Sequence, residues 1–100
     1  MEYERGAFDA TIAAAAGEDP ALLAELRAAF HESLDHHLDL LRRARCDGNW
    51  VVAAQRIKGL AASFHATDLM EMADNAIVGA PGEPGVVRRM ERFRDRFVAE

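Results

Sequence analysis

The residues with the clearest chemical potential lie close together between residues 50 and 64. Gln55 is followed one helical turn later by Lys58 and Gly59, and Arg56 is its neighbour in the chain. A carboxamide both donates and accepts hydrogen bonds, and the two cations suit an acidic pocket or a phosphoryl group. This grouping indicates a surface that binds an anionic group.

The four histidines are the other candidates for nucleophilic or metal chemistry. His36 and His37 are adjacent, so on a helix they diverge by about 100° and cannot both bind one small ion. His31 and Asp35 have the i, i+4 spacing of a ligand pair, but two ligands fall short of a closed zinc shell. His65 suits a helix end, where its charge complements the dipole. We therefore expect no metal site, no cofactor and no catalytic residue.

Length and composition point to one small helical domain that covers residues 1–100. Half of the 100 residues are hydrophobic, which is enough to close one core around a few helices. Helix formers prevail, above all alanine and leucine, and only 7% of the residues are aromatic. The sequence predicts an all-α chain.

Charge and cysteine content exclude several classes of partner. The net charge of −5 argues against a nucleic-acid binder, which needs a basic face to displace counterions. The arginines of residues 88–96 predict a solvated helix face, where Glu91 and Asp95 partly offset their positive charges.

Cys46, the only cysteine, is expected as a small apolar residue at a helix end, and a lone cysteine fits a reducing cytoplasm. No apolar run approaches the ~18 residues of a membrane span. We expect a monomeric, cytoplasmic protein with no membrane or nucleic-acid partner.

Local signals predict the first two helices. Residues 8–16 form a short alanine-rich stretch that ends at Gly17 and is too short to stand without packing on another element. Asp19 is an N-cap candidate directly before Pro20, and proline is tolerated at the first helical position. A long helix follows to about Ala44. Its apolar residues recur in steps of three and four and predict one buried stripe: Leu22, Leu23, Leu26, Phe30, Leu34, Leu38 and Leu41.

Two further helices are predicted after a short turn. Asn49 is a candidate cap for a helix over residues 50–64, and Thr67 or Asp68 for the helix that follows. The apolar residues of this following helix keep i, i+3, i+4, i+7, i+8 spacing: Leu69, Met72, Ala73, Ala76 and Ile77. Each of the two helices is thus expected to bury a single face.

A loop rich in glycine and proline, residues 79–85, precedes the last helix. That helix is marked by Val86, Met90, Phe93 and Phe97. Short connections favour antiparallel neighbours. We therefore expect an up-down-up-down antiparallel four-helix bundle with a short N-terminal capping helix.

A helical wheel at about 100° per residue divides residues 50–64 into two faces. Six residues lie within about 60° of the direction opposite to Gln55 and predict the buried stripe: Trp50, Ala53, Ile57, Leu60, Ala61 and Phe64. The outward arc carries small or apolar residues, which is unusual for a solvent face. Gly59 costs a helix interior about 1 kcal/mol relative to alanine, so it needs a packing or functional reason. We call the predicted partner-binding face the Gln55 surface; it consists of Val51, Val52, Gln55, Arg56, Lys58, Gly59 and Ala62.

The sequence of residues 54–66, AQRIKGLAASFHA, resembles the motif of histidine-containing phosphotransfer domains, A-H-x-L-K-G-x-A-x-x-L-G-A. Lys58 and Gly59 match the lysine and the first glycine of the motif. Gln55 stands at the position of the phospho-accepting histidine, and His65 at the later glycine. The Asp-Pro pair before a long helix, the Asp-Gly-Asn-Trp turn and the spacing after the motif also agree. The resemblance extends from about residue 17 to the C-terminus.

This resemblance implies a bundle that docks a response-regulator receiver domain or a sensor histidine kinase of a phosphorelay. In the family the lysine, here Lys58, lies beside the phosphorylated side chain. An imidazole attacks phosphorus through a free ring-nitrogen lone pair, whereas the lone pair of the Gln55 amide nitrogen is delocalised into its carbonyl. Gln55 can keep the hydrogen bonds of docking without phosphoryl transfer. We therefore expect a pseudo-phosphotransfer adaptor, not an enzyme, that acts by occupying its partner.

Several alternatives stay open on the sequence alone. Another histidine could carry the phosphoryl group, or Gln55 could replace a native histidine. The bundle could serve only for self-association or scaffolding. A neighbouring helix, either residues 20–44 or the last one, could cover the small residues around Gly59. The sequence leaves open which partner binds and whether the adaptor inhibits or assists it.

Overall fold

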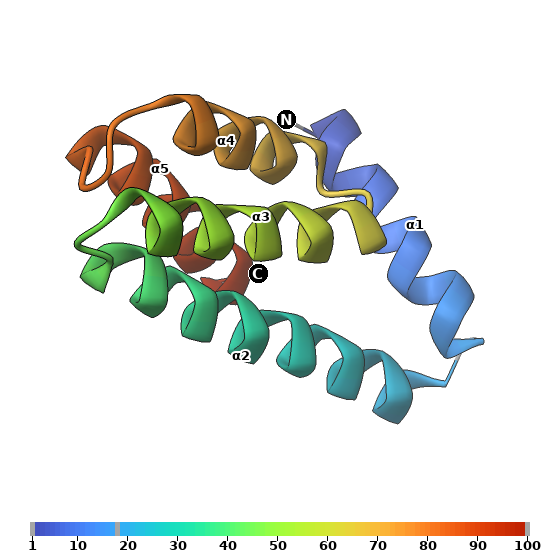
Figure 1. Cartoon of the computed structure of the whole chain (residues 1–100). Coiled ribbons are helices and arrows are strands. Elements are labelled where there is room, and N and C mark those ends of the chain that lie inside the picture. The colour runs from blue at the N-terminus through green and yellow to red at the C-terminus, as the bar shows by residue number, and fades with distance from the viewer. Residues whose placement is uncertain (1, 18, 100) are drawn as a thin grey trace.

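Five helices make up the fold of the computed structural model, which describes the backbone of residues 2–17 and 19–99 and the side chains of residues 9–17 and 19–97. They are, in chain order, α1 (Glu2–Ala16), α2 (Pro20–Arg43), α3 (Asp47–Ser63), α4 (Thr67–Val78) and α5 (Pro84–Ala99) (Figure 1). No strand occurs in the described ranges, so the all-α prediction is confirmed. Within the same ranges, no helix has both the length and the apolar character to span a bilayer.

The start of α2 follows the sequence signals closely. The Asp19 carboxylate accepts hydrogen bonds from the backbone N–H groups of Ala21 at 3.0 Å and Leu22 at 3.3 Å, and Pro20 is the first helical residue. Gly17 ends α1 with a φ of +60°, a conformation that glycine adopts at little cost. The first helix is longer than predicted, because α1 begins at Glu2 and not at residue 8.

The predicted caps of α3 and α4 are wrong. The N–H of Trp50 donates to the carbonyl of Cys46 at 3.1 Å, so α3 begins at Asp47 and Asn49 lies inside its first turn. An aspartate in the first turn complements the helix dipole, which favours this earlier start. In α4 the cap residue is Ala66, and Thr67 is already helical. Cys46 is exposed and free rather than packed as an apolar residue.

Helix α3 is held between two neighbours. Its most extensive contacts are with α4 and then with α2, while α5 contacts α2 and α4, and α1 contacts α2. Figure 1 shows α3 in front, between α4 and α2, with α5 behind. The Trp50 side chain is 1% exposed and its indole N–H donates to the carbonyl of Ala76 at 2.6 Å, which fixes α3 against α4. Within the described part of the chain, no helix covers the outer side of α3, where Gln55 and Gly59 are exposed.

Candidate functional site

The buried stripe of α3 agrees with the helical wheel, with one addition. Trp50, Ala53, Ile57 and Ala61 are buried, and the partly buried Leu60 and Phe64 pack against the same core. Ala54 is also fully buried, although the wheel places it to the side of this stripe. The reason is that α4 packs along that flank and extends the covered sector.

Gln55 lies on the opposite, outward side of α3, and its side chain is exposed. Four more members of the Gln55 surface are exposed with it: Val52, Arg56, Gly59 and Ala62. Val52 is 48% exposed and adds apolar area to this face. Val51 and Lys58 are half-buried on the flank that faces α4. The seven predicted residues thus form one continuous helix face, with Gln55 at its centre.

Gly59 has no packing reason to be glycine. A Cβ atom placed on it would meet nothing within 4 Å, so no described helix crosses α3 at this point. Its φ angle is also unexceptional, because the left-handed glycines of the described chain are Gly17 and Gly82. The alternative that a neighbouring helix covers Gly59 therefore fails. What remains is a flat, open position next to Gln55.

Lys58 is paired with a residue that the sequence did not single out. Its Nζ lies 2.8 Å from the carboxylate oxygen Oδ1 of Asp74 on α4, with the two side chains 44% and 53% exposed. The pair connects the Gln55 surface to the neighbouring helix. A helical wheel of one helix could not have found it, because it depends on which flank of α3 the helix α4 occupies.

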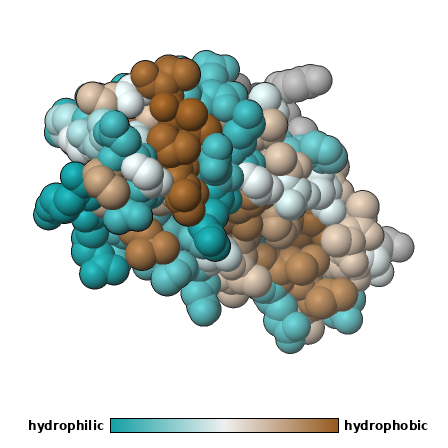
Figure 2. Space-filling view, viewed as in Figure 1, coloured by the Kyte–Doolittle hydropathy of each residue, from teal (hydrophilic) through white to brown (hydrophobic). Residues whose placement is uncertain are grey.

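Apolar surface gathers unevenly on the face that includes α3. Figure 2 shows one brown band running from α4 toward α3 and a second brown area over the first part of α2. The exposed large apolar residues are Leu22, Leu40, Val52 and Val78, and Val78 is 84% exposed. Of these four residues, only Val52 belongs to the Gln55 surface.

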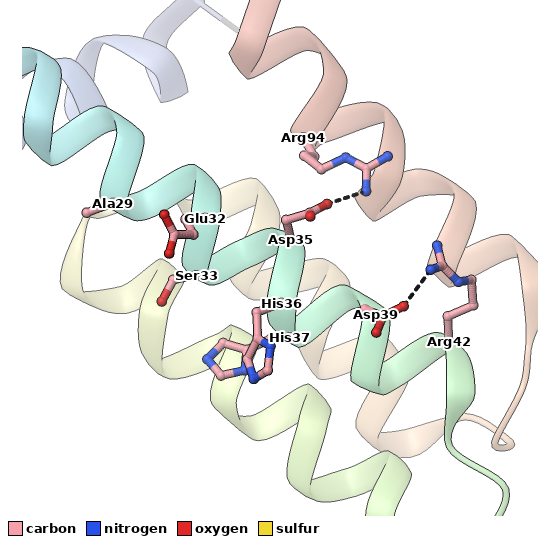
Figure 3. A pocket seen from close by; sticks show the side chains of 9 residues that line it. All are labelled: Ala29, Glu32, Ser33, Asp35, His36, His37, Asp39, Arg42 and Arg94. Atoms are coloured by element: carbon pink, nitrogen blue, oxygen red, sulfur yellow. Dashed lines mark hydrogen bonds and ion pairs between the residues drawn. The ribbon is translucent and has the colours of Figure 1, made fainter.

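Two histidines of α2 lie next to each other, with ring centroids 5.3 Å apart. Figure 3 shows their rings on one side of α2, away from the ion pairs that Asp35 makes with Arg94 and Asp39 makes with Arg42. Burial, followed by the charges of His36 and Arg56, lowers the pKa of His37 below its usual range. The Nδ1 atom of His37 is buried and has no hydrogen-bond partner among the described residues. His37 is therefore a neutral, half-buried ring at neutral pH.

The other two histidines make structural contacts. His31 stacks on Phe97 with nearly parallel rings, 6.4 Å between centroids and 8° between planes. His65 has a φ of +56° and its Nδ1 lies 2.7 Å from the Oγ1 of Thr11 on α1. Among the described residues, no three histidine, cysteine, aspartate or glutamate side chains come close enough to hold a metal ion.

The left-handed residue His65 is part of a complete helix ending. Its N–H donates to the carbonyl of Ala62 at 3.2 Å, and the N–H of Ala66 donates to the carbonyl of Ala61 at 2.9 Å. These two bonds define a Schellman motif, whose left-handed position favours glycine. Because a residue with a Cβ is strained in this conformation, His65 carries backbone strain that a glycine would avoid.

The arginine-rich α5 is partly tied into the fold. Arg94 lies 2.9 Å from Asp35 of α2 and 3.1 Å from Asp95, and its side chain is 21% exposed. Glu91 lies 3.2 Å from Arg42 of α2. Asp95 therefore offsets an arginine of α5, as predicted, whereas Glu91 pairs with Arg42 of α2 and not with an arginine of its own helix.

Comparison of the chain with protein-family models, with curated proteins and with solved structures finds no match. No relative is therefore at hand to assign a role to the Gln55 surface.

Proposed function

We propose that this chain is a binding module of a two-component phosphorelay, similar to a histidine-containing phosphotransfer domain but unable to carry a phosphoryl group at Gln55. It docks a receiver domain, or the dimeric helices of a sensor histidine kinase, through the Gln55 surface. The observation that carries the proposal is an exposed carboxamide at the centre of an uncovered helix face, at the motif position of the histidine.

The proposal includes the arrangement of the helices. We infer that α2 to α5 form an up-down-up-down antiparallel four-helix bundle and that α1 caps one end of it. The contacts of α3 and α5 with both α2 and α4 support this inference, as do the short connections between helices. In such a bundle, α3 presents one stripe to the core and the opposite one to a partner.

The chemistry of Gln55 separates docking from transfer. Its carboxamide can exchange hydrogen bonds with a partner over about the same reach as an imidazole. It has no free nitrogen lone pair with which to attack an aspartyl phosphate. The module therefore changes signal flow by occupying a receiver or a kinase, within the cytoplasm.

Two substitutions test the docking surface. Lys58→Glu reverses the charge beside Gln55, and Gly59→Trp places a large ring on the open position. We expect each to weaken binding at least about tenfold, since like charges or a steric block at the centre of an interface cost more than 1.4 kcal/mol. Binding is measured by calorimetry against receiver domains and kinase helices, beginning with those encoded near its gene.

The matched controls are Arg92→Glu on α5 and Ala28→Trp on the outer side of α2, both at exposed residues. They make comparable changes away from α3, a charge reversal and an added indole ring, and are expected to bind as the parent does. Circular dichroism establishes that all four variants fold. Parent-like affinity of both α3 variants would show that the partner docks elsewhere.

The transfer chemistry is tested by restoring the ring. Gln55→His is expected to gain acid-labile phosphoryl label from a phosphorylated receiver, while the parent gains none. Label on the parent that disappears when one of its own histidines is replaced would overturn the proposal in favour of an active phosphotransfer protein.

A further inference from the structure

Lys58 is the only lysine of the chain, and the structure gives its ammonium group an internal partner. The distance of 2.8 Å between Nζ and the Oδ1 of Asp74 is that of a charge-assisted hydrogen bond. Both side chains are about half exposed, so water can reach the pair and a ligand can replace either member. The contact is therefore an exchangeable one.

Asp74 is held firmly beside the Gln55 surface. The contacts between α3 and α4 are the most extensive in the fold, and the bond from Trp50 to Ala76 lies two residues beyond Asp74 in α4. Its backbone is consequently fixed on the flank of the surface where an acidic pocket would approach Lys58, while its half-exposed carboxylate can exchange partners. A partner that uses Lys58 must displace this carboxylate and tolerate its charge.

We propose that Asp74 is a built-in competitor for the partner, an intramolecular stand-in for the acidic group that Lys58 would bind. This inference rests on the proposed function and adds a regulatory contact to the same site. Asp74 lowers the affinity of docking and keeps the complex easily reversible. An anion of higher charge than one carboxylate, such as a phosphoryl group beside acidic side chains, displaces it more readily.

The first test needs no partner. Urea denaturation of the parent, Lys58→Met, Asp74→Asn and the double variant gives the coupling between the two side chains. Exposed ion pairs typically change an equilibrium constant by about two- to five-fold, and we expect a coupling of that size in the folding equilibrium. Additive effects of the two substitutions would mean that the pair does not exist in solution, which overturns the inference.

The second test measures binding of the same four proteins to a receiver that the parent binds. Asp74→Asn is expected to tighten binding about two- to five-fold or more, because both the competition and the repulsion disappear. The gain should vanish in the Lys58→Met background. Glu71→Gln, which removes an equal charge from an exposed position of α4, is the matched control and should leave affinity nearly unchanged.

The outcomes separate the two proposals. If no receiver or kinase helix binds the parent or Asp74→Asn, the proposed function fails and the inference fails with it. If Lys58 contributes to binding but Asp74→Asn does not tighten it, only the inference is overturned. The inference is also overturned if Glu71→Gln tightens binding as much as Asp74→Asn, or if Asp74→Asn still tightens binding in the Lys58→Met background. Either result would mean that Asp74 acts only through the net charge of the surface and not by competing for Lys58.

Discussion

Gly59→Ala tests whether the centre of the Gln55 surface is open. An alanine at this position gains helix propensity of about 1 kcal/mol over glycine, because the glycine backbone loses more freedom on folding. The added Cβ meets nothing within 4 Å, so no clash opposes the gain. We expect the free energy of unfolding of the variant to exceed that of the parent by about 0.5–1 kcal/mol. For a domain of this size, that corresponds to a rise in melting temperature of roughly 2–8 °C.

The assay is urea denaturation followed by far-ultraviolet circular dichroism. Gly17→Ala is the matched control, because it makes the same chemical change at a φ of +60°, where a Cβ is strained. That variant should lose about 1 kcal/mol of stability. Opposite signs for the two alanines would show that the effect comes from local backbone geometry.

A loss of stability in Gly59→Ala would refute the reasoning. It would mean that some segment packs on Gly59 closely enough to exclude one methyl group, and the surface proposed for docking would then be covered. If stability instead rises as expected, the chain carries a glycine that weakens its own fold. A position of that kind is explained by function better than by packing, since proteins retain destabilising residues where activity needs them.

Three further substitutions test other parts of the structure. His65→Gly removes left-handed backbone strain of about 1 kcal/mol, but it also removes a hydrogen bond to Thr11 of similar size. By urea denaturation, the substitution should hardly change the free energy of unfolding when Thr11 is present. It should raise that free energy when Thr11 has been replaced by valine. Trp50→Phe removes the indole N–H that bonds to the carbonyl of Ala76 and leaves a void, and should cost about 2–3 kcal/mol by the same assay. Burial lowers the pKa of His37, so protonation favours the unfolded state. The free energy of unfolding should therefore carry no His37 penalty above the unfolded pKa of about 6.5 and should fall as the pH drops below that value. Urea denaturation between about pH 7.5 and pH 5.5 should show a smaller fall for His37→Gln than for the parent.

The features predicted correctly are those that neighbouring residues in the chain determine. Asp19 and Pro20 define the start of α2, and Gly17 the end of α1, through bonds and φ angles within a few residues. The outward direction of Gln55 follows in the same way, because one helix period relates it to the buried Ile57 and Ala61.

The features that were missed depend on contacts between helices or on competition between adjacent signals. The prediction that Asn49 caps α3 was wrong because an earlier start, at Asp47, is also compatible with the sequence. Asp47 in the first turn is stabilised by the helix dipole, and the helix begins there. The burial of Ala54 and the pairing of Lys58 with Asp74 require α4 to lie on one particular flank of α3. A wheel drawn for α3 alone gives the direction of its core but not the position of each neighbour.

The location of the histidines separates an adaptor from a relay that uses another phosphate acceptor. His31 is stacked on Phe97 and His65 is bonded to Thr11, so each would have to leave a structural contact before reacting. The exposed His36 lies on α2, beside the half-buried His37. A receiver that phosphorylated His36 would have to centre its acidic pocket on α2, whereas an adaptor would bring the same pocket to Gln55 on α3. The two hypotheses therefore predict different footprints, and amide chemical-shift changes caused by a bound receiver should concentrate on residues 51–62 if the adaptor proposal is right, and on residues 32–40 if the relay operates through α2.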